Sequence, residues 1–255
     1  ESVPVLIAYT YNGKRFEKQA DDFDFDLLTK VDLEKSSCWY PINDLPLGYN
    51  TEQPIRSHGI GNVNLFYTNR NLFALSLLFS KIDSSSMSNK LKFLFTGMIN
   101  RSTKMNRIHV NNYFFGGGGW NAGHLKGTLY IPSLPIETSI LEQIEDKISS
   151  YIKASYHLPT QLDNMLYVGS ANATSIKSNS VDYIFVDPPF GANIMYSELN
   201  FLAEAWLKVI TNNLNEAIEN KTQGKNYSHY LNMMTRCFRE FYRILKPNKW
   251  MTVEF

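Results

Sequence analysis

The chain has 255 residues, of which 44% are hydrophobic and 19% are charged, and its formal net charge is +1. These values indicate a soluble globular protein with a sizeable core. They exclude a chain made of membrane-spanning helices, because no apolar run reaches the length of a membrane span. No signal peptide opens the sequence, and Cys38 and Cys237 stand alone, so we expect a cytoplasmic protein in which neither cysteine is catalytic.

The first part of the chain predicts a hairpin followed by helices. Residues 4–11 (PVLIAYTY) read as a strand, and Asn12-Gly13 is typical of a tight turn into a second strand at 14–18. Residues 22–33 predict a loop and a short helix. Residues 39–58, rich in Pro, Gly and Asn, predict irregular structure. Further predictions are helices at 69–82, 89–100 and 139–154, a glycine-rich loop at 116–127 and a short strand at 128–131.

From about residue 161 the pattern changes to strands that alternate with helices. Such alternation implies a parallel sheet with helical crossovers. We therefore predict an α/β fold with a mixed region over residues 1–160 and a half-domain with part of a parallel sheet over residues 161–255. The predicted strands are 165–168, 181–186 and 250–255, and the predicted helices are 197–211 and 228–245.

Acidic and basic residues are distributed unevenly along the chain. Residues 17–34 are rich in Asp and Glu, whereas residues 84–136 contain neither. Such a one-sided segment predicts a surface that faces a polyanion. The alternative is an ordinary solvated face that neighbouring acids neutralise. The candidate nucleic-acid contacts in this segment are Lys90, Arg101, Lys104, Arg107 and Lys126.

The tetrapeptide Asp187-Pro188-Pro189-Phe190 directly follows the predicted strand at 181–186. Two prolines offer no backbone N–H, so this segment suits neither a sheet interior nor a helix interior. Ligands of open α/β sheets bind beyond the carboxyl ends of the strands. There, the proline carbonyls and the Asp187 carboxylate would form acceptors for an amino group such as that of a nucleobase, and Phe190 would offer a ring to stack on. These four residues are candidate catalytic residues.

The tetrapeptide resembles the catalytic motif of S-adenosylmethionine-dependent amino-methyltransferases, which methylate the 6-amino group of adenine or the 4-amino group of cytosine in DNA. The similarity covers roughly residues 165–255, with LYVGSA at 166–171 and LKPN at 245–248 in matching positions. Residues 191–200, 204–206 and, more weakly, 68–72 are similar to a large bacterial subgroup. The resemblance implies a partial Rossmann-like class I methyltransferase sheet, S-adenosylmethionine as cofactor and a target base, adenine, flipped out of double-stranded DNA.

The resemblance also implies cofactor contacts from Gly169, Ser170, Asn172 and Asp187. An acid usually follows the glycine in this family, and a hydroxyl such as that of Ser170 binds more weakly than a carboxylate. A plain turn at a strand end is the alternative for this segment. Residues 115–119 (FGGGG) match the methionine-binding Phe-x-Gly-x-Gly string, but the following sequence leads to a strand instead of a helix. We interpret this segment as a loop near DNA, with Trp120 and Lys126, and expect the true cofactor loop outside this sequence.

Other polar residues leave their roles open. Ser197 is either a helix cap or, with Tyr196, Glu198 and Asn200, part of the target pocket. Trp206 is predicted to lie in the core. The five histidines have no metal-like spacing, and no metal site is predicted. The arginines predicted to form a solvated helix face are Arg236, Arg239 and Arg243.

These observations predict a site-specific DNA methyltransferase, with partner subunits of a modification or defence system as a further expectation. The first alternative is an RNA guanine 2-amino methyltransferase, which would use the same motif and chemistry. The second is a non-catalytic nucleic-acid-binding protein that keeps the scaffold. Because the sequence starts at Glu1 and stops in mid-strand at Phe255, we expect a fragment of a longer protein that is inactive without the rest.

Overall fold

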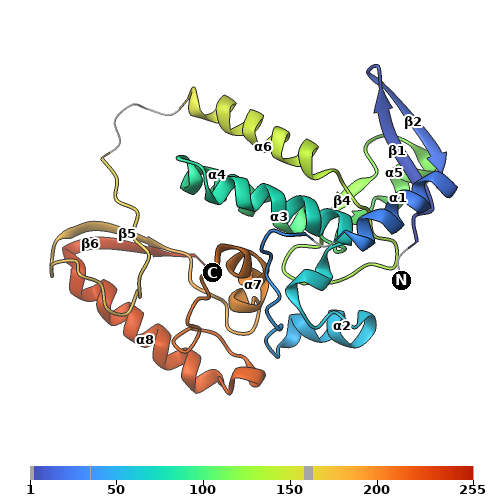
Figure 1. The fold of residues 1–255 in the computed structure, drawn as a ribbon. Helices are drawn as coiled ribbons and strands as arrows, with labels where there is room; N and C mark the ends of the chain where they lie inside the picture. Colours follow the sequence, from blue (N-terminus) through green and yellow to red (C-terminus); the bar gives the residue numbers. More distant parts are fainter. Residues whose placement is uncertain (1–2, 35, 158–162, 255) are drawn as a thin grey trace.

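The computed structural model describes residues 3–34, 36–157 and 163–254, shown as a ribbon in Figure 1. Within these residues the fold is mixed α/β, with three two-stranded sheets among the helices. The predicted boundary between residues 160 and 161 lies outside the described residues, as does Phe255. No helix of the described ranges is long and apolar enough to cross a membrane.

The N-terminal hairpin is confirmed. Strands β1 (Leu6–Tyr11) and β2 (Lys14–Gln19) pair antiparallel, with Tyr11 opposite Lys14. Asn12 and Gly13 have φ values of 47° and 72°, the left-handed backbone that a two-residue turn requires. Helix α1 (Asp22–Leu33) fills the next segment, which was predicted as a loop and a short helix. Its N-terminus forms a capping box in which the side chains of Asp21 and Asp24 accept each other's backbone N–H.

The prediction of irregular structure for residues 39–58 is wrong in its second half, where α2 (Tyr49–His58) forms. Gly48 precedes this helix and Pro54 lies within it, so the local composition suggests a loop. The cap of the helix comes instead from Glu198, a side chain 148 residues away in sequence. Local sequence cannot reveal such a distant contact.

Helices α3 (Asn69–Asp83), α4 (Ser88–Ile99) and α6 (Ile140–Ser155) pack together and confirm three predicted helices (Figure 1). Helix α7 (Tyr196–Leu207) comes from the other side of the predicted boundary and contributes to the same core. Trp206 is fully buried there and donates from Nε1 to the Tyr67 hydroxyl at 3.0 Å. The prediction that Trp206 is a core residue is confirmed.

A small sheet joins β3 (Arg107–Ile108) to β4 (Asn121–Gly123), with helix α5 (Val110–Phe115) between them. The strand predicted at residues 128–131 does not form. Ile131 is buried, but its N–H and carbonyl bond to the side-chain amide of Gln53 in place of a neighbouring strand. Within the described residues, short 3-10 helices form at η1 (Val63–Phe66), η2 (Asn100–Ser102) and η3 (Lys221–Gln223).

The third sheet consists of two parallel strands, β5 (Val181–Val186) and β6 (Leu245–Val253). Helix α8 (Tyr227–Ile244) lies along one face of this sheet, as Figure 1 shows. Ile184 is buried, whereas Tyr183 and Phe185 are exposed. This alternation is that of a sheet covered on one side.

The prediction of a strand at residues 165–168 is wrong. These residues pair with no described strand, and the exposed fractions of Leu166 and Val168 are 95% and 100%. An extended segment needs a partner to become a strand. The described residues therefore show a mixed α/β fold with a parallel pair, and they do not show a Rossmann-like sheet. Helix α7 stops four residues earlier than predicted, because Lys208 turns left-handed at φ 60° and the Glu204 carboxylate binds the N–H and hydroxyl of Thr211.

Candidate functional site

The tetrapeptide starts directly after β5, at the carboxyl end of the strand. The N–H of Glu254 donates to the carbonyl of Val186 at 2.9 Å and keeps the end of β6 beside it. Asp187 is exposed, and its carboxylate has no hydrogen-bond or ion-pair partner among the described residues. The predicted position of the motif is therefore confirmed, and the Asp187 carboxylate is accessible as an acceptor.

The loop after Asp187 is fixed by three hydrogen bonds to its backbone carbonyls. The Tyr230 hydroxyl donates to Pro189 at 2.9 Å, the N–H of Asn193 to Phe190 at 3.0 Å, and the N–H of Glu219 to Gly191 at 3.1 Å. Gly191 has φ 55°, a conformation that favours glycine. Within the described ranges, no donor reaches the carbonyl of Pro188. The Pro189 carbonyl thus already accepts one hydrogen bond, whereas the Pro188 carbonyl, the other predicted acceptor, accepts none within the described residues.

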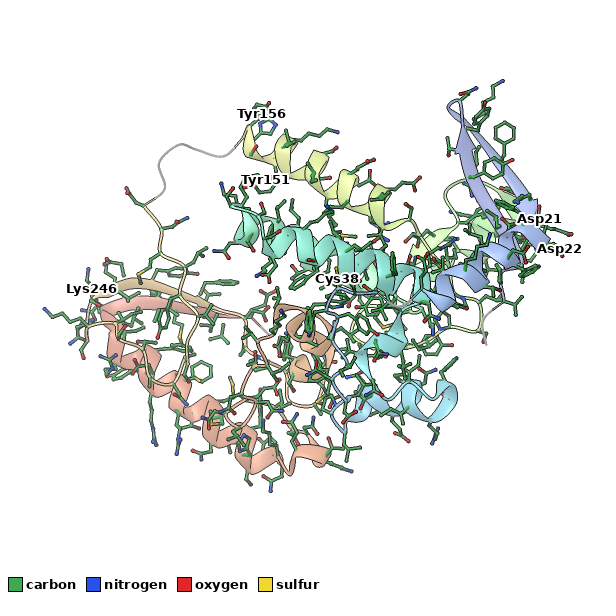
Figure 2. The ribbon with its side chains drawn as sticks, in the orientation of Figure 1. Asp21, Asp22, Cys38, Tyr151, Tyr156 and Lys246 are labelled. Atoms are coloured by element: carbon green, nitrogen blue, oxygen red, sulfur yellow. The ribbon has the colours of Figure 1, made fainter. Side chains whose placement is uncertain are left out.

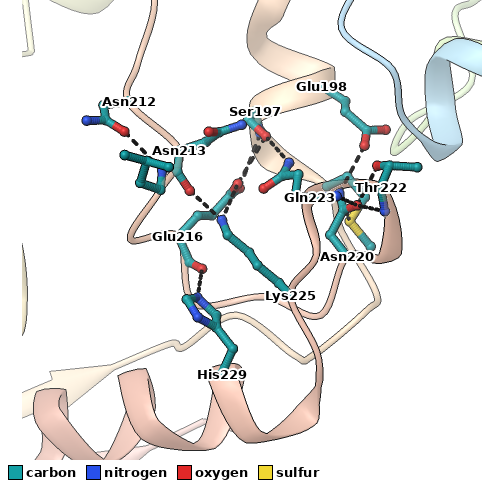
Figure 3. Close-up of polar contacts among 12 residues, drawn as sticks. Ser197, Glu198, Asn212, Asn213, Glu216, Asn220, Thr222, Gln223, Lys225 and His229 are labelled. Carbon is teal, nitrogen blue, oxygen red and sulfur yellow. Dashed lines mark hydrogen bonds and ion pairs between the residues drawn. The ribbon is translucent and has the colours of Figure 1, made fainter.

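A polar network is centred on Glu216. Figure 3 shows the side chains of Ser197, Lys225 and His229 in contact with this residue. The backbone N–H and the hydroxyl of Ser197 donate to the Glu216 carboxylate at 3.3 and 3.0 Å, so this acid caps the start of α7. Lys225 lies 4.0 Å from Glu216 and donates to the carbonyl of Asn213. Burial lowers the pKa of Lys225, and the nearby Glu216 partly offsets this effect. His229 contacts the Glu216 carbonyl at 3.3 Å. Ser197 therefore lies in the first turn of α7 and is not its cap, because Met195 holds the N-cap position and the Glu216 carboxylate accepts the helix N–H.

Glu198 joins α7 to the N-terminal region. Its side chain is 1% exposed and accepts the backbone N–H of Asn50 at 2.8 Å and the side-chain amides of Asn50 and Asn220, both at 3.1 Å. The carboxylate thus caps α2, where the helix dipole favours negative charge. A Cβ at Gly48 would overlap with this carboxylate. Glu198 therefore has a structural role. Its neighbours on the same helix, Tyr196 and Asn200, are exposed.

The candidate cofactor residues Gly169, Ser170 and Asn172 make local contacts within their own segment. The Ser170 hydroxyl bonds to the Asn172 side chain at 2.9 Å, and both residues are close to the surface. Gly169 lies against the ring of Tyr167, which leaves no room for a Cβ. No hydrogen bond links this segment to Asp187 within the described residues. The Ser170 hydroxyl and the Asn172 side chain thus bond to each other, and a role of this segment in cofactor binding stays a prediction.

Two charged residues of α8, Glu240 and Arg243, bind residues 174–178. Glu240 accepts the N–H and hydroxyl of Thr174 at 2.8 and 2.6 Å and forms an ion pair with Arg243 at 2.6 Å. Arg243 also donates to the carbonyl of Ile176 at 2.7 Å and to the hydroxyl of Ser178 at 2.9 Å. The Arg243 guanidinium and the bonds from Thr174 lower the pKa of Glu240 to about 2. The prediction of a solvated face is wrong for Arg243, because its partners lie far from it in sequence.

The basic segment places three of its predicted contacts together. Burial lowers the pKa of His124, and the positive charges of Lys126, Arg101 and Arg107 lower it further. Lys104 is half-buried, which lowers its pKa, and Lys90 lies in the first turn of α4. In the part of the chain that the structure describes, none of the five predicted contacts forms an ion pair.

The glycine-rich segment after Phe115 connects α5 to β4. Gly116 and Gly117 both have positive φ, 75° and 99°, which turns the chain away from helix. A phosphate- or methionine-binding loop would lead from a strand to a helix N-terminus. The geometry therefore agrees with the interpretation of this segment as a surface loop.

Comparisons with protein-family models, with curated proteins and with solved structures found no match. Across the described ranges, no group of three or more His, Cys, Asp or Glu side chains is placed to hold a metal ion. The interpretation of the site consequently rests on its residues and on their geometry.

Proposed function

We propose that this chain carries the catalytic motif of an S-adenosylmethionine-dependent methyltransferase that acts on the exocyclic amine of a flipped base in DNA, with adenine as the target. One observation carries the proposal. At the carboxyl end of a parallel strand, the Asp187 carboxylate is exposed and unpaired among the described residues, and the adjacent backbone is held by Tyr230. Fixed acceptors at such an edge suit a ligand with two N–H donors.

The chemistry follows from the poor nucleophilicity of a nucleobase amine. Its lone pair is delocalised into the ring, and acceptors aimed at both N–H bonds favour a pyramidal nitrogen. The Asp187 carboxylate and the Pro188 carbonyl would supply these acceptors and stabilise positive charge on the nitrogen as it attacks. Phe190 would stack on the flipped base and offset its lost stacking. In the family that the motif resembles, the methyl donor is S-adenosylmethionine, and its binding residues in this chain remain predictions.

We further propose that β5 and β6 belong to a larger Rossmann-like sheet. The two strands are parallel and are connected through α7 and α8, and α8 covers one face (Figure 1). Parallel sheets are normally buried on both faces. The exposed Tyr183 and Phe185 on the other face are therefore consistent with further covering elements in the active enzyme.

The basic cluster supports a nucleic acid as the substrate. The charges of Arg101, Arg107 and Lys126 all act on His124, where they lower its pKa, and these three residues make no ion pair within the described ranges. Such a cluster is suited to phosphate groups. Partner subunits of a modification system remain a prediction on which these contacts do not bear.

The test is methyl transfer from tritiated S-adenosylmethionine to DNA by the complete protein and by its Asp187→Ala variant. Removing an acceptor of this kind is expected to lower the rate about a hundredfold or more. Asp182→Ala is the control. Asp182 is an exposed acid on β5, the strand that precedes Asp187, and its carboxylate forms ion pairs with Lys246 and Lys249. Digestion and mass spectrometry of the product identify the methylated base. Full activity of Asp187→Ala, or methylation of RNA guanine alone, would refute the proposal.

A further inference from the structure

An exposed group of aromatic rings lies on α5 and on the loop after it. Phe114 and Phe115 are 69% and 86% exposed, and Tyr113 is also exposed. The ring of Tyr113 lies 4.9 Å from that of Phe114 and 4.9 Å from that of Trp120, in both cases edge to face. We call Tyr113, Phe114, Phe115 and Trp120 the aromatic platform. Neighbouring exposed rings of this kind mark an interaction surface more often than a bare surface.

Backbone contacts hold the platform in place. The N–H of His109 donates to the carbonyl of Trp120 at 2.5 Å, and the Asn112 amide donates to the carbonyl of Gly119 at 2.9 Å. The loop between them is glycine, and a Cβ at Gly116, Gly117 or Gly119 would meet open space. Gly116 and Gly117 have a positive φ, which favours glycine, and a Cβ at Gly118 would lie 2.7 Å from the Asn112 side-chain amide. The backbone of the loop thus takes a turn that holds Trp120 beside α5.

Positive charge borders the platform. The guanidinium of Arg15, on β2, lies 4.3 Å above the Trp120 ring, and this arginine also lies 3.8 Å from Glu17. Arg107 donates to the carbonyl of Gly123 on the strand that continues from Trp120, and it belongs to the basic cluster around His124. Exposed rings beside cations, in a segment without acids, match a strand whose bases are free to stack and whose phosphates are negative.

We propose that the aromatic platform binds unpaired DNA, with bases stacked on Phe114 and Phe115 and phosphates on the neighbouring arginines. A protein partner without acidic side chains would gain nothing from the bordering charge, whereas an intact duplex hides its bases from the rings. In the proposed methyltransferase, the unpaired strand would lie beside the flipped base. That connection rests on the proposed function, whereas binding by stacking does not.

The experiment measures fluorescence anisotropy of a labelled deoxythymidine oligomer of about 12 nucleotides, within the range of known single-strand sites. A second oligomer of equal length contains abasic residues, which keep the phosphates and remove the bases. Wild-type protein should bind the thymidine oligomer at least about tenfold more tightly than the abasic one. The double variant Phe114→Ala with Phe115→Ala should lose this preference, and Phe114→Tyr with Phe115→Tyr should keep it.

Phe93→Ala is the matched control, since Phe93 has the same exposed fraction as Phe114, 69%, but lies on α4. It should leave both affinities unchanged. Equal binding of the two oligomers by the wild-type protein would overturn the proposal, as would an equal loss in Phe93→Ala or tighter binding of a uridine RNA oligomer of the same length. Asp187→Ala should bind like the wild type, so a failure of methyl transfer and a failure of stacking are separate results.

Discussion

The Tyr230 hydroxyl donates a 2.9 Å hydrogen bond to the carbonyl oxygen of Pro189. This contact connects α8 to the tetrapeptide and uses the acceptor that would otherwise compete with Pro188 for a bound amine. It also fixes the peptide plane that follows Pro188, because the two prolines leave few other rotations. Tyr230 is therefore a positioning residue for the proposed reaction, without contact to the reacting atoms.

In the complete protein, Tyr230→Phe should reduce methyl transfer by about tenfold, because a loosened acceptor no longer meets the amine in a fixed geometry. The fold should survive, since one such hydrogen bond contributes about 1 kcal/mol. The rate constant at saturating substrate should fall more than the Michaelis constant changes. Tyr227→Phe, an exposed position on the same helix, is the control. An unchanged rate constant in Tyr230→Phe would show that the loop holds its geometry without this bond.

Glu198→Ala should lower the free energy of unfolding by about 3 kcal/mol, because it removes a buried acceptor and leaves the donors of Asn50 and Asn220 unpaired. Gly48→Ala should also destabilise the protein. Gly48 has an extended φ of −174°, which any residue adopts, so the cost comes from the overlap of the new Cβ with Glu198.

The two changes should therefore be non-additive. In a Glu198→Ala background, Gly48→Ala should have little further effect on urea unfolding. Gly61→Ala serves as the control, since a Cβ there meets nothing within 4 Å and its φ is not left-handed. If the losses of unfolding free energy in Gly48→Ala and Glu198→Ala were additive, the contact of Glu198 with residues 48–50 would not be the origin of both effects.

Glu240 should make the free energy of unfolding depend on pH in the acidic range. Its pKa is lowered from the ordinary value of 4.5 to about 2, chiefly by hydrogen bonds from Arg243 and Thr174. A depressed carboxyl pKa contributes stability that is fully present above the unfolded value and is lost as the pH falls through the folded value. The loss should therefore run from 4.5 down to about 2.

Thermal unfolding across this pH range measures the effect. Glu240→Gln should lower the midpoint near neutral pH and make the remaining acid dependence shallower. Glu145→Gln, at an exposed position on α6, should change neither. An equally steep acid dependence in Glu240→Gln would assign it to other carboxylates.

The accuracy of the sequence predictions follows the range of the contacts involved. The turn at Asn12 and helices α3, α4 and α6 depend on neighbours a few residues away, and the sequence predicts them. Helix α2 depends on Glu198, and Ile131 depends on Gln53. These partners are far away in the chain, so local composition suggested irregular structure in the first case and the local sequence suggested a strand in the second.

The same distinction applies to the site. Strand β5 and the break after it could be read from residues 181–190 alone. The roles of Tyr230, Glu240 and Arg243 could not, because a helical arginine or tyrosine looks the same in sequence whether it faces water or a loop. The spacing of Tyr230 from the tetrapeptide, 41 residues from Pro189, follows no local pattern.

The 255-residue chain should bind S-adenosylmethionine weakly. Ser170 and Asn172 bond to each other, and the loop after Phe115 leads to a strand. Isothermal titration should detect no micromolar binding, and Asn172→Ala should not change the result. Micromolar binding that is lost in Asn172→Ala would instead place the cofactor at this segment.

The basic cluster should dominate the salt dependence of DNA binding. Each phosphate contact releases counterions, so the logarithm of the affinity should fall with the logarithm of salt concentration by about 0.9 per contact. Changing Arg101, Arg107 and Lys126 together to Ala should flatten this slope by up to about 2.7, and it should weaken binding to all duplex sequences alike, since phosphate contacts carry no base information. Loss at one sequence only would mean that these side chains read bases.

The control for this cluster is the triple change of Lys30, Lys81 and Lys153 to Ala, which removes the same charge from exposed positions on α1, α3 and α6. Its slope should stay close to that of the wild type, because these lysines lie on three separate helices outside the acid-free segment. A similar flattening in both triple variants would show that net charge alone governs the affinity. A slope unchanged by loss of Arg101, Arg107 and Lys126 would direct the search for the DNA path to the exposed Arg236 and Arg239 on α8.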